Sequence, residues 1–259
     1  MCLIVFALDA HPEFWLVLAG NRDEMLARPT APASLWKEED GAEWFGGRDL
    51  EKGGTWLGLS PSGRLAAVTN VRSPSARRDG ASRGWLARDA VTSQEPIGVF
   101  ARGIEGARYP AFNLLCADGR QMIYARDDAP AVAVAPGLHG LSNERLDTYW
   151  PKVEIGLRRL SALLERPASL APDALFELLG DRSLADDAML PHTGVPLEVE
   201  RVLSAAFVRT PAYGTRCSTV ILWHRSGTLY FEERSFDAAG ANVGTVRETF
   251  RLPAPATRR

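Results

Sequence analysis

The chain has few cysteines and no long apolar run, and each shortage excludes a class of protein. Its three cysteines, Cys2, Cys116 and Cys217, are too few and too widely spaced for a disulfide framework or a zinc site. No apolar stretch reaches the roughly 18 residues typical of a membrane-spanning helix, and the apolar start has no basic segment of a signal peptide. The sequence therefore favours a cytoplasmic protein with no integral membrane association.

The chain also lacks an excess of charge of one sign. It has 30 Lys and Arg against 32 Asp and Glu, a formal net charge of −2 and an isoelectric point of about 6.1. Non-specific binding to nucleic acid or to an anionic membrane depends on an excess of basic side chains. We therefore expect no nucleic-acid partner, and we expect a small-molecule ligand or substrate instead.

Several cofactor-binding and catalytic motifs are missing as well. The paired glycines at 46–47 and 53–54 lack the GK[ST] ending of a phosphate-binding loop, and no GxSxG or CxxCH motif occurs. The histidines show no metal-ligand spacing with one another; they are His11, His139, His192 and His224. The sequence thus predicts no metal site and no required cofactor.

What remains is the composition of an ordinary globular domain, with 46% hydrophobic and 24% charged residues over 259 positions. Strand patterns dominate both ends of the chain and helical patterns the middle. That order predicts an α+β fold of layered, mainly antiparallel sheets and argues against a doubly wound one. We expect a single domain over residues 1–252 and a flexible C-terminal tail over 253–259.

Local patterns place most elements. A hairpin is predicted over 3–8 and 14–19, with the polar group Asn21–Glu24 following its second strand and a Pro-rich loop over 28–32. The clearest helix is predicted over 147–165, where one apolar side recurs at three- and four-residue steps: Tyr149, Val153, Leu157, Leu160 and Leu164. An exposed loop is predicted over 72–84. The remaining predicted helices are 84–93, 96–104 and 172–179, and the remaining strands are 65–69, 112–116, 121–125, 132–134, 138–141, 219–223, 229–236 and 246–252.

Cys2 is the first candidate for a catalytic residue. An initiator methionine is normally removed when the second residue is small, which would leave Cys2 at the N-terminus. Its thiol, with an unperturbed pKa of about 8.5, and its α-amino group, at about 7.7–8.0, would then lie on adjacent carbons. One residue would carry both a nucleophile and a proton acceptor near neutral pH. The alternative is an ordinary small apolar residue at the start of a strand.

The ordered set of motifs along the whole chain resembles the NRDE-motif family, the transport-and-Golgi-organisation protein family. The matching segments are Met1 to Phe6, Asn21-Arg22-Asp23-Glu24, Gly46-Gly47-Arg48-Asp49, Gly53 to Gly58, Val68 to Arg72, Leu141-Ser142-Asn143 and Tyr213 to Thr219. The resemblance implies an N-terminal-nucleophile (Ntn) type αββα sandwich, in which two stacked antiparallel sheets lie between two helical layers.

The chain also resembles, more weakly, the penicillin-V-acylase and bile-salt-hydrolase group of Ntn amidases. By that resemblance Cys2 matches the nucleophile, and Asp23 matches the carboxylate that positions its free amine. Asn70 matches an oxyanion donor, Asn143 the second asparagine, and Arg216 a late, strand-borne arginine.

The chain departs from that pattern at Arg22, which directly precedes Asp23. Neighbours on a strand point to opposite faces, so the two side chains are not both expected to face the thiol. An arginine near Cys2, either Arg22 or Arg216, would favour the thiolate.

The other motif residues are expected to bind substrate around Cys2: Asn21, Arg22, Glu24, Gly53, Gly54, Trp56 and Arg72. Structural alternatives stay open, since Asn21–Glu24 is also typical of a turn and the glycine pairs are typical of turns with positive φ. Asn70 and Asn143 could cap loops, and Arg216 could be a surface residue. The arginines at 72, 77, 78, 83 and 88 could be solvated or could meet an acidic ligand.

Two functions from different classes follow. One is a hydrolase that cleaves a carbon–nitrogen bond of a small, non-peptide amide or acyl substrate through Cys2. The other, implied by the family resemblance, is a non-enzymatic protein that binds and traffics haem, lipid or acyl-CoA, so that haem would be a ligand rather than a required cofactor. A purely structural role is a third alternative.

Overall fold

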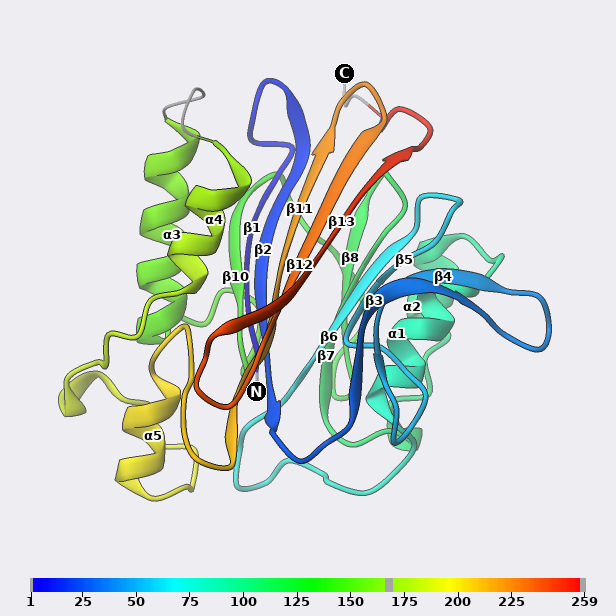
Figure 1. The fold of residues 1–259 in the computed structure, drawn as a ribbon. Coiled ribbons are helices and arrows are strands. Elements are labelled where there is room, and N and C mark those ends of the chain that lie inside the picture. Colours follow the sequence, from blue (N-terminus) through cyan, green and yellow to red (C-terminus); the bar gives the residue numbers. More distant parts are fainter. Residues whose placement is uncertain (1, 166–169, 257–259) are drawn as a thin grey trace.

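Two stacked antiparallel sheets form the centre of the molecule (Figure 1). The computed structural model describes residues 2–165 and 170–256. The first sheet has six strands in the order β10-β1-β2-β11-β12-β13. Their bounds are β1 Cys2–Leu8, β2 Phe14–Met25, β10 Gly137–Leu141, β11 Tyr213–His224, β12 Thr228–Phe236 and β13 Asn242–Arg251.

The second sheet has seven strands in the order β3-β4-β5-β6-β7-β8-β9. Each strand pairs with its neighbours in the chain, so this sheet is a meander. The bounds are β3 Thr30–Lys37, β4 Glu43–Asp49, β5 Leu57–Leu59, β6 Leu65–Asn70, β7 Phe112–Ala117, β8 Met122–Arg126 and β9 Val132–Ala133.

Helices cover the outer faces of both sheets. The α3 and α4 helices lie against the six-stranded sheet, and α1 and α2 lie against the seven-stranded one (Figure 1). This is the four-layer αββα sandwich expected from the sequence. The bounds are α1 Arg83–Thr92, α2 Ile97–Arg102, α3 Pro151–Leu164, α4 Pro172–Leu179 and α5 Leu197–Leu203, with short 3-10 turns at Gly106–Arg108 and Asp187–Met189.

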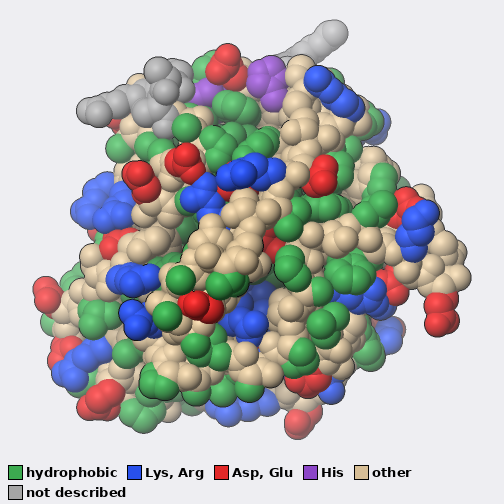
Figure 2. All heavy atoms as spheres, viewed as in Figure 1, with side chains coloured by type: hydrophobic (Ala, Val, Ile, Leu, Met, Phe, Trp, Pro, Cys, Tyr) green, Lys and Arg blue, Asp and Glu red, His purple; other side chains and the backbone are tan. Residues whose placement is uncertain are grey.

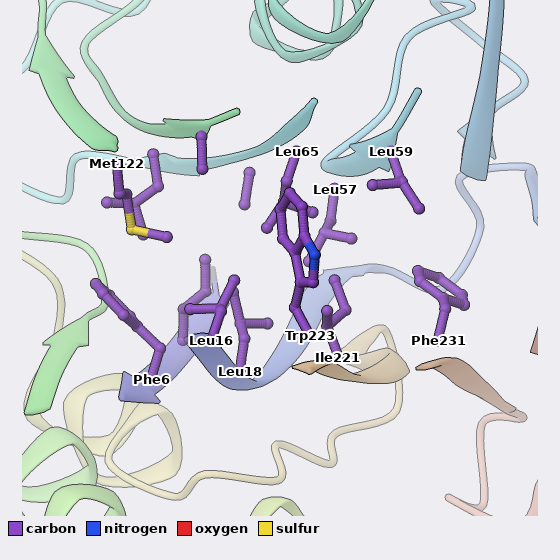
Figure 3. Packing of buried hydrophobic residues seen from close by; sticks show 14 of the residues in the cluster. Phe6, Leu16, Leu18, Leu57, Leu59, Leu65, Met122, Ile221, Trp223 and Phe231 are labelled. Carbon is purple, nitrogen blue, oxygen red and sulfur yellow. The ribbon is translucent and has the colours of Figure 1, made fainter. Parts of the chain in front are cut away.

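Strand alternation divides the apolar side chains between two cores. Along β1, Ile4 and Phe6 face the second sheet, whereas Leu3 and Val5 face the helices α3 and α4. Figure 3 shows the core between the sheets, where aromatic and branched side chains of one sheet meet those of the other: Phe6, Leu16, Leu18, Ile221, Trp223 and Phe231 against Leu57, Leu59, Leu65 and Met122. Cys2 belongs to this inner face of β1.

The predicted helix over 147–165 begins later than expected. Pro151 occupies its first turn, where a missing N–H costs nothing, and residues 147–150 precede the helix. Val153 and Leu160 are buried as predicted, but Tyr149 lies outside the helix and is 73% exposed. The prediction that Tyr149 is a core residue was therefore wrong.

Two other local predictions change, and one helix was missed. The strand β2 continues to Met25, so Asn21–Glu24 lies within a strand and the turn alternative is excluded. The Pro-rich segment 28–32 is not all loop, because β3 begins at Thr30. The helix α5 was not predicted from the sequence.

Part of the predicted flexible tail is held in place. Pro255 is buried, and the Ala256 N–H donates to the Gly119 carbonyl in the turn between β7 and β8. Residues 257–259 of that tail lie outside the described residues.

Charges of both signs are interspersed on the face of the molecule shown in Figure 2. The histidine side chains visible there lie at its top edge, whereas the described chain starts near the lower end of the sheets (Figure 1). Over residues 2–165 and 170–256, none of the helices combines the length and the apolar character needed to cross a bilayer.

Candidate active site

Cys2 lies at the first position of β1, on the face that meets the second sheet. Only 7% of its surface is exposed, and it lines a cavity of about 420 Å³ between the sheets. Burial raises the pKa of the Cys2 thiol, and the Asp23 carboxylate raises it further. The Asp23 backbone N–H and the Arg22 guanidinium act against this rise without cancelling it. Arg22 thus favours the thiolate, as expected for a neighbouring arginine, but burial has the larger effect and the net change of the thiol pKa is upward.

Strand pairing decides which motif residues share the face of Cys2. In the β1–β2 ladder Cys2 pairs with Arg22, so both side chains point to the same face of the sheet. Asp23, the next residue, points to the helix side, as the alternation predicted. Both residues nonetheless line the Cys2 cavity, because they lie at the end of the sheet where the cavity opens.

Two hydrogen bonds fix the position of Asp23 near the start of β1. Its side chain is buried, and Oδ1 accepts a hydrogen bond from Thr215 Oγ1 at 2.7 Å. Its backbone carbonyl accepts from the Tyr213 hydroxyl at 3.0 Å. Burial raises the pKa of the Asp23 carboxyl, and the positive charges of Lys152 and Arg22 lower it.

Asn21 occupies a position different from that expected of a substrate-binding residue. It points to the helix side, where its Nδ2 donates to the carbonyls of Leu179 at 2.9 Å and Ala206 at 2.7 Å. Its Oδ1 accepts from Ser218 Oγ at 2.6 Å. Asn21 is fully buried, and both its amide nitrogen and its amide oxygen are hydrogen-bonded, so it links the helical layer to the sheet.

Arg22 and Glu24 face the cavity instead. The Arg22 Nη1 donates to Thr30 Oγ1 at 3.2 Å, and its Nη2 lies 3.6 Å from a Glu24 carboxylate oxygen. These contacts keep the Arg22 guanidinium extended along the wall beside Cys2.

Two asparagines join the ends of β6 and β10 beside Cys2. Asn70 lines the cavity, and its carbonyl accepts a hydrogen bond from Asn143 Nδ2 at 2.9 Å. The preceding Ser142 donates from Oγ to the Cys2 carbonyl at 2.9 Å. Asn143 is fully buried and donates one hydrogen bond to the Asn70 backbone, so it links the segment after β10 to the end of β6.

Arg216 lies at a bulge in β11, where the register with β2 shifts between Thr215 and Cys217. Its Nη1 donates to three backbone carbonyls, that of Met25 at the end of β2 and those of Leu26 and Arg28 in the connection to β3. Arg216 is not among the described residues that line the Cys2 cavity. It lines a neighbouring cavity of about 190 Å³, which shares Arg22, Asp49 and Trp56 with the first. The structure therefore does not group Arg216 with the other predicted catalytic residues.

The glycine pair at 53–54 shapes one wall of the site. Gly53 has a φ of +76° and closes a turn by donating its N–H to the Asp49 carbonyl at 2.7 Å. Gly54 packs on the start of α1 so closely that a Cβ atom there would lie 2.3 Å from the Gly84 carbonyl carbon. Thr55, Trp56 and Gly84 line the cavity, so the pair borders it through its neighbours.

Arg83, at the first turn of α1, also lines the Cys2 cavity. Its Nη1 donates to the Ala111 carbonyl at 3.0 Å, and burial lowers the pKa of its guanidinium while Cys2 and Glu24 raise it. The sequence placed this arginine in a basic loop but gave no reason to link it with Cys2.

Lys152 was missed altogether. It is 3% exposed, and its charge acts on both Asp23 and Cys2. Its only signal in the sequence was that it is one of three lysines.

Arginines line a third cavity of about 350 Å³ that adjoins the first. The two cavities share Asn70, Arg78, Arg83 and Pro110. Arg72 and Arg77 line it too, and none of its described lining residues is acidic. Arg72 is anchored from behind, because its Nη2 lies 3.1 Å from Glu200 Oε2 and its guanidinium lies 4.6 Å from the centre of the Trp150 ring.

The histidines do not contribute to the site. Within residues 2–165 and 170–256, none of the four lines the Cys2 cavity, and no group of His, Cys, Asp and Glu side chains could hold a metal ion. His139 instead pairs with Asp147 at 2.8 Å, and His224 pairs with Ser226 at 2.7 Å.

Comparisons with known proteins find similar sequences over most of the chain. The family model described as Transport and Golgi organisation 2 matches residues 1–238. The chain is 38% identical to the Transport and Golgi organization protein 2 homolog of Bos taurus and 35% identical to that of Homo sapiens, over 91% of this chain and 93% of each relative. It is 26% identical to the Transport and Golgi organization protein 2 of Drosophila melanogaster, over 91% of this chain and 92% of the relative.

Two solved structures share the fold at low sequence identity. One is the Caenorhabditis elegans ortholog of N-acylethanolamine-hydrolyzing acid amidase, with a TM-score of 0.50 and 13% identity, covering 85% of this chain and 92% of that one. The other is a mutant of the conjugated bile acid hydrolase from Clostridium perfringens, with a TM-score of 0.52 and 8% identity, covering 100% of both chains. The fold is thus Ntn-hydrolase-like, as the sequence resemblance implied.

The wall formed by Gly54 provides a test of the site's construction. In Gly54→Val the new side chain meets backbone atoms of Gly84 and Trp85, which cannot rotate away. We expect a loss of about 1–3 kcal/mol in the free energy of unfolding, measured by urea denaturation, together with a distorted cavity wall. Gly244→Val is the matched control, because nothing lies within 4 Å of a Cβ atom there. Equal stability of the two variants would contradict the close packing at Gly54.

Proposed function

The chain belongs to the Transport and Golgi organisation 2 family, and from the geometry around Cys2 we propose that it is a cysteine hydrolase of the Ntn type. It cleaves the carbon–nitrogen bond of a small, non-peptide acyl substrate through Cys2, after Met1 has been removed. The observation that carries the proposal is the placement of Cys2 at a 420 Å³ cavity lined also by Arg22, Asp23 and Asn70.

The raised pKa of the buried thiol makes a nearby base necessary. Removal of Met1 would supply one, because the α-amine of Cys2 then becomes free beside the thiol. Asp23 lies within electrostatic reach of Cys2 and is held by Thr215, so its carboxylate can orient that amine. The proposal therefore uses groups that the fold already gathers at one strand end.

The reaction proceeds through a thioester. The α-amine accepts the thiol proton while Sγ adds to the substrate carbonyl carbon, and donors such as the Asn70 amide stabilise the resulting oxyanion. The carbon–nitrogen bond breaks, and the leaving amine takes the proton from the α-ammonium. A water molecule, deprotonated by the same amine, then hydrolyses the thioester, which releases the acid and restores the thiol.

The first substrates to test are acyl amides. The structural neighbours are named for the hydrolysis of N-acylethanolamines and of conjugated bile acids. All three cysteines are free thiols, which suits a reducing compartment such as the cytoplasm.

A second function, binding and trafficking of acyl-CoA or another anionic lipid derivative, is supported by a different observation. The arginine-lined cavity adjoins the Cys2 cavity and has no acidic residue among its described lining. An anionic group would fit the arginine lining of this adjoining cavity. Haem receives less support, because none of the histidines described lines the Cys2 cavity.

The processing of the N-terminus is the first prediction. We expect intact-mass measurement to show that Met1 is absent, and iodoacetamide to label Cys2 with a midpoint near pH 7–8, roughly the titration range of an α-amine. In a form extended at its N-terminus the amine stays in a peptide bond. Labelling should then require a higher pH, because burial raises the pKa of the thiol.

Cys116 is the internal control for this experiment, since burial raises its pKa to about 12. Cys2→Ser should fold normally and lose the fast labelling. Retention of Met1, or labelling of Cys2 no faster than that of Cys116, would argue for the binding function instead.

Hydrolysis itself is the second prediction. Against a panel of acyl amides, Cys2→Ala should lower kcat/KM at least about 10³-fold, because the nucleophile is lost. Cys116→Ala is the matched control and should retain activity, since this buried thiol is remote from the cavity. Hydrolysis that survives in Cys2→Ala would remove the proposed mechanism.

The anionic preference of the third cavity is the next prediction. Arg78 is exposed and lines both cavities, so Arg78→Glu should weaken the binding of an acyl-CoA about tenfold or more in calorimetry. Binding should also weaken as salt is added. Arg120→Glu, at the turn between β7 and β8, is the control. Equal affinity of the two variants would argue against an anionic site there.

A further inference from the structure

The smaller cavity beside the Cys2 site is lined by buried polar residues that the proposed mechanism does not use. Its volume is about 190 Å³, and it shares Arg22, Asp49 and Trp56 with the cavity of about 420 Å³ that Cys2 lines. Strand pairing explains this connection, because Arg22 on β2 pairs with Cys2 on β1 and with Cys217 on β11. The three side chains therefore lie on one face of the sheet, and Cys217 lines the smaller cavity as Cys2 lines the larger one.

Glu233 on β12 is a buried carboxyl group in the wall of the smaller cavity. It is 2% exposed, and its Oε1 accepts a hydrogen bond from the Ala33 N–H on β3 at 2.7 Å, so the side chain reaches across to the second sheet. Its Oε2 has no partner within hydrogen-bond distance among the described residues. Burial raises the pKa of this carboxyl, and the Ala33 N–H, Cys217 and Thr219 act against the rise. An oxygen without a donor inside a protein is costly, so a ligand that donates to it is stabilised.

Two hydrogen-bond donors of the same lining also lack partners. The indole Nε1 of Trp56 and the Nε of Arg216 are both buried, and neither has an acceptor in the part of the chain that the structure describes. Arg216 thus keeps one N–H unused although its Nη1 donates to backbone carbonyls. An unused buried donor carries the same kind of cost as an unused acceptor.

The other charged residues of the lining already have partners within the protein. These contacts join Arg22 to Thr30 and Glu24, Arg48 to Glu38, and Asp49 to Arg28. Among the charged and indole groups of the described lining, one acceptor and two donors are therefore left for a ligand.

A neutral hydroxyl group suits this set of atoms. It has one O–H donor and two lone pairs, which match Glu233 Oε2 and the two unused N–H groups in number. An ammonium group would meet three guanidinium groups in the lining, those of Arg22, Arg48 and Arg216, and an anionic group would meet Glu233. A hydroxyl group also suits either protonation state of Glu233, because it can both donate and accept.

We propose that the 190 Å³ cavity is a subsite for a hydroxyl group on the leaving amine of the substrate, held by Glu233, Trp56 and Arg216. This inference rests on the proposed function, and it narrows the substrates to N-acyl derivatives of small amino alcohols. The subsite takes the amine side because its volume is less than half that of the Cys2 cavity. The larger space is then left to the scissile bond and the acyl group.

The test compares amides that share a hexanoyl group and differ only in the leaving amine. The amides of ethanolamine and propanolamine are paired with the isosteric amides of propylamine and butylamine, in which a methyl group replaces the hydroxyl. In at least one pair we expect kcat/KM to be about tenfold or more higher for the hydroxylated amide. The reason is that the alkyl amide leaves the buried polar atoms of the subsite unpaired.

Glu233→Gln keeps the shape of the side chain but replaces one carboxylate oxygen by an amide NH₂, so the substrate hydroxyl loses its acceptor. The kcat/KM values within each pair should then agree within about twofold. Glu232→Gln is the matched control and should keep the preference. Glu232 is also buried on β12, but it points to the opposite face, where it pairs with Arg234 and Arg247. A preference that survives in Glu233→Gln would overturn the inference.

Binding in a Cys2→Ala background separates this inference from the proposed function. There the hydroxylated amide should bind about tenfold more tightly than its isostere in calorimetry, and Glu233→Gln should remove the difference. If the amides bind in this order but the unmodified protein does not hydrolyse them, the proposed function fails and the subsite stands. If hydrolysis depends on Cys2 but kcat/KM is equal within both pairs, water satisfies the buried atoms and only the inference fails. Absence of both binding and hydrolysis for all four amides would overturn both.

Gly47→Ala covers the case in which Glu233→Gln does not fold. A Cβ atom at position 47 would lie 3.1 Å from Glu233 Oε2, so the new methyl group takes space next to the proposed hydroxyl position. We expect the preference for the hydroxylated amide to fall at least about threefold. Gly244→Ala is the control, because nothing lies within 4 Å of a Cβ atom there. An unchanged preference in Gly47→Ala would contradict the subsite.

Discussion

The pairing of β1 with β2 is the constraint on which the site depends. Antiparallel pairing of Cys2 with Arg22 places the thiol and a guanidinium on one face of the sheet, and it places Asp23 on the other face at the same strand end. The bulge in β11 beside Asp23 then brings the Thr215 hydroxyl to its carboxylate. A shift of one residue in this register would exchange the two faces and disperse the site.

The same alternation explains why the four motif residues at 21–24 have different roles. Asn21 and Asp23 point toward the helices. There Asn21 donates hydrogen bonds to backbone carbonyls, and the positive charge of Lys152 lowers the pKa of Asp23. Arg22 and Glu24 point into the cavity. Asn21 therefore has a structural role, whereas Arg22, Asp23 and Glu24 all line the Cys2 cavity.

Burial controls the chemistry of the cavity. It raises the pKa of the Cys2 thiol and of the Asp23 carboxyl and lowers that of Lys152, so each group alone is poorly suited to carry its charge. Together the groups compensate one another. The nucleophilic chemistry proposed for the site requires that the amine of Cys2 be freed, whereas the proposed binding of an anionic acyl compound depends on the arginines that line the adjoining cavity.

Much of the fold followed from the sequence, because strand alternation and helix periodicity are local and the ordered motifs pointed to one family. They predicted the hairpin that carries Cys2, the antiparallel layers and the approach of Asn70. They could not predict the positions of Arg216 and Asn21. Arg216 lies at a bulge and donates to backbone carbonyls, and the Asn21 amide is hydrogen-bonded to the helical layer. Lys152 and Arg83 lie within electrostatic range of Cys2 because α3 and α1 pack on the outer faces of the two sheets. Such long-range packing, and the burial that sets each pKa, leave no local pattern in the sequence, so the tertiary structure alone decided them.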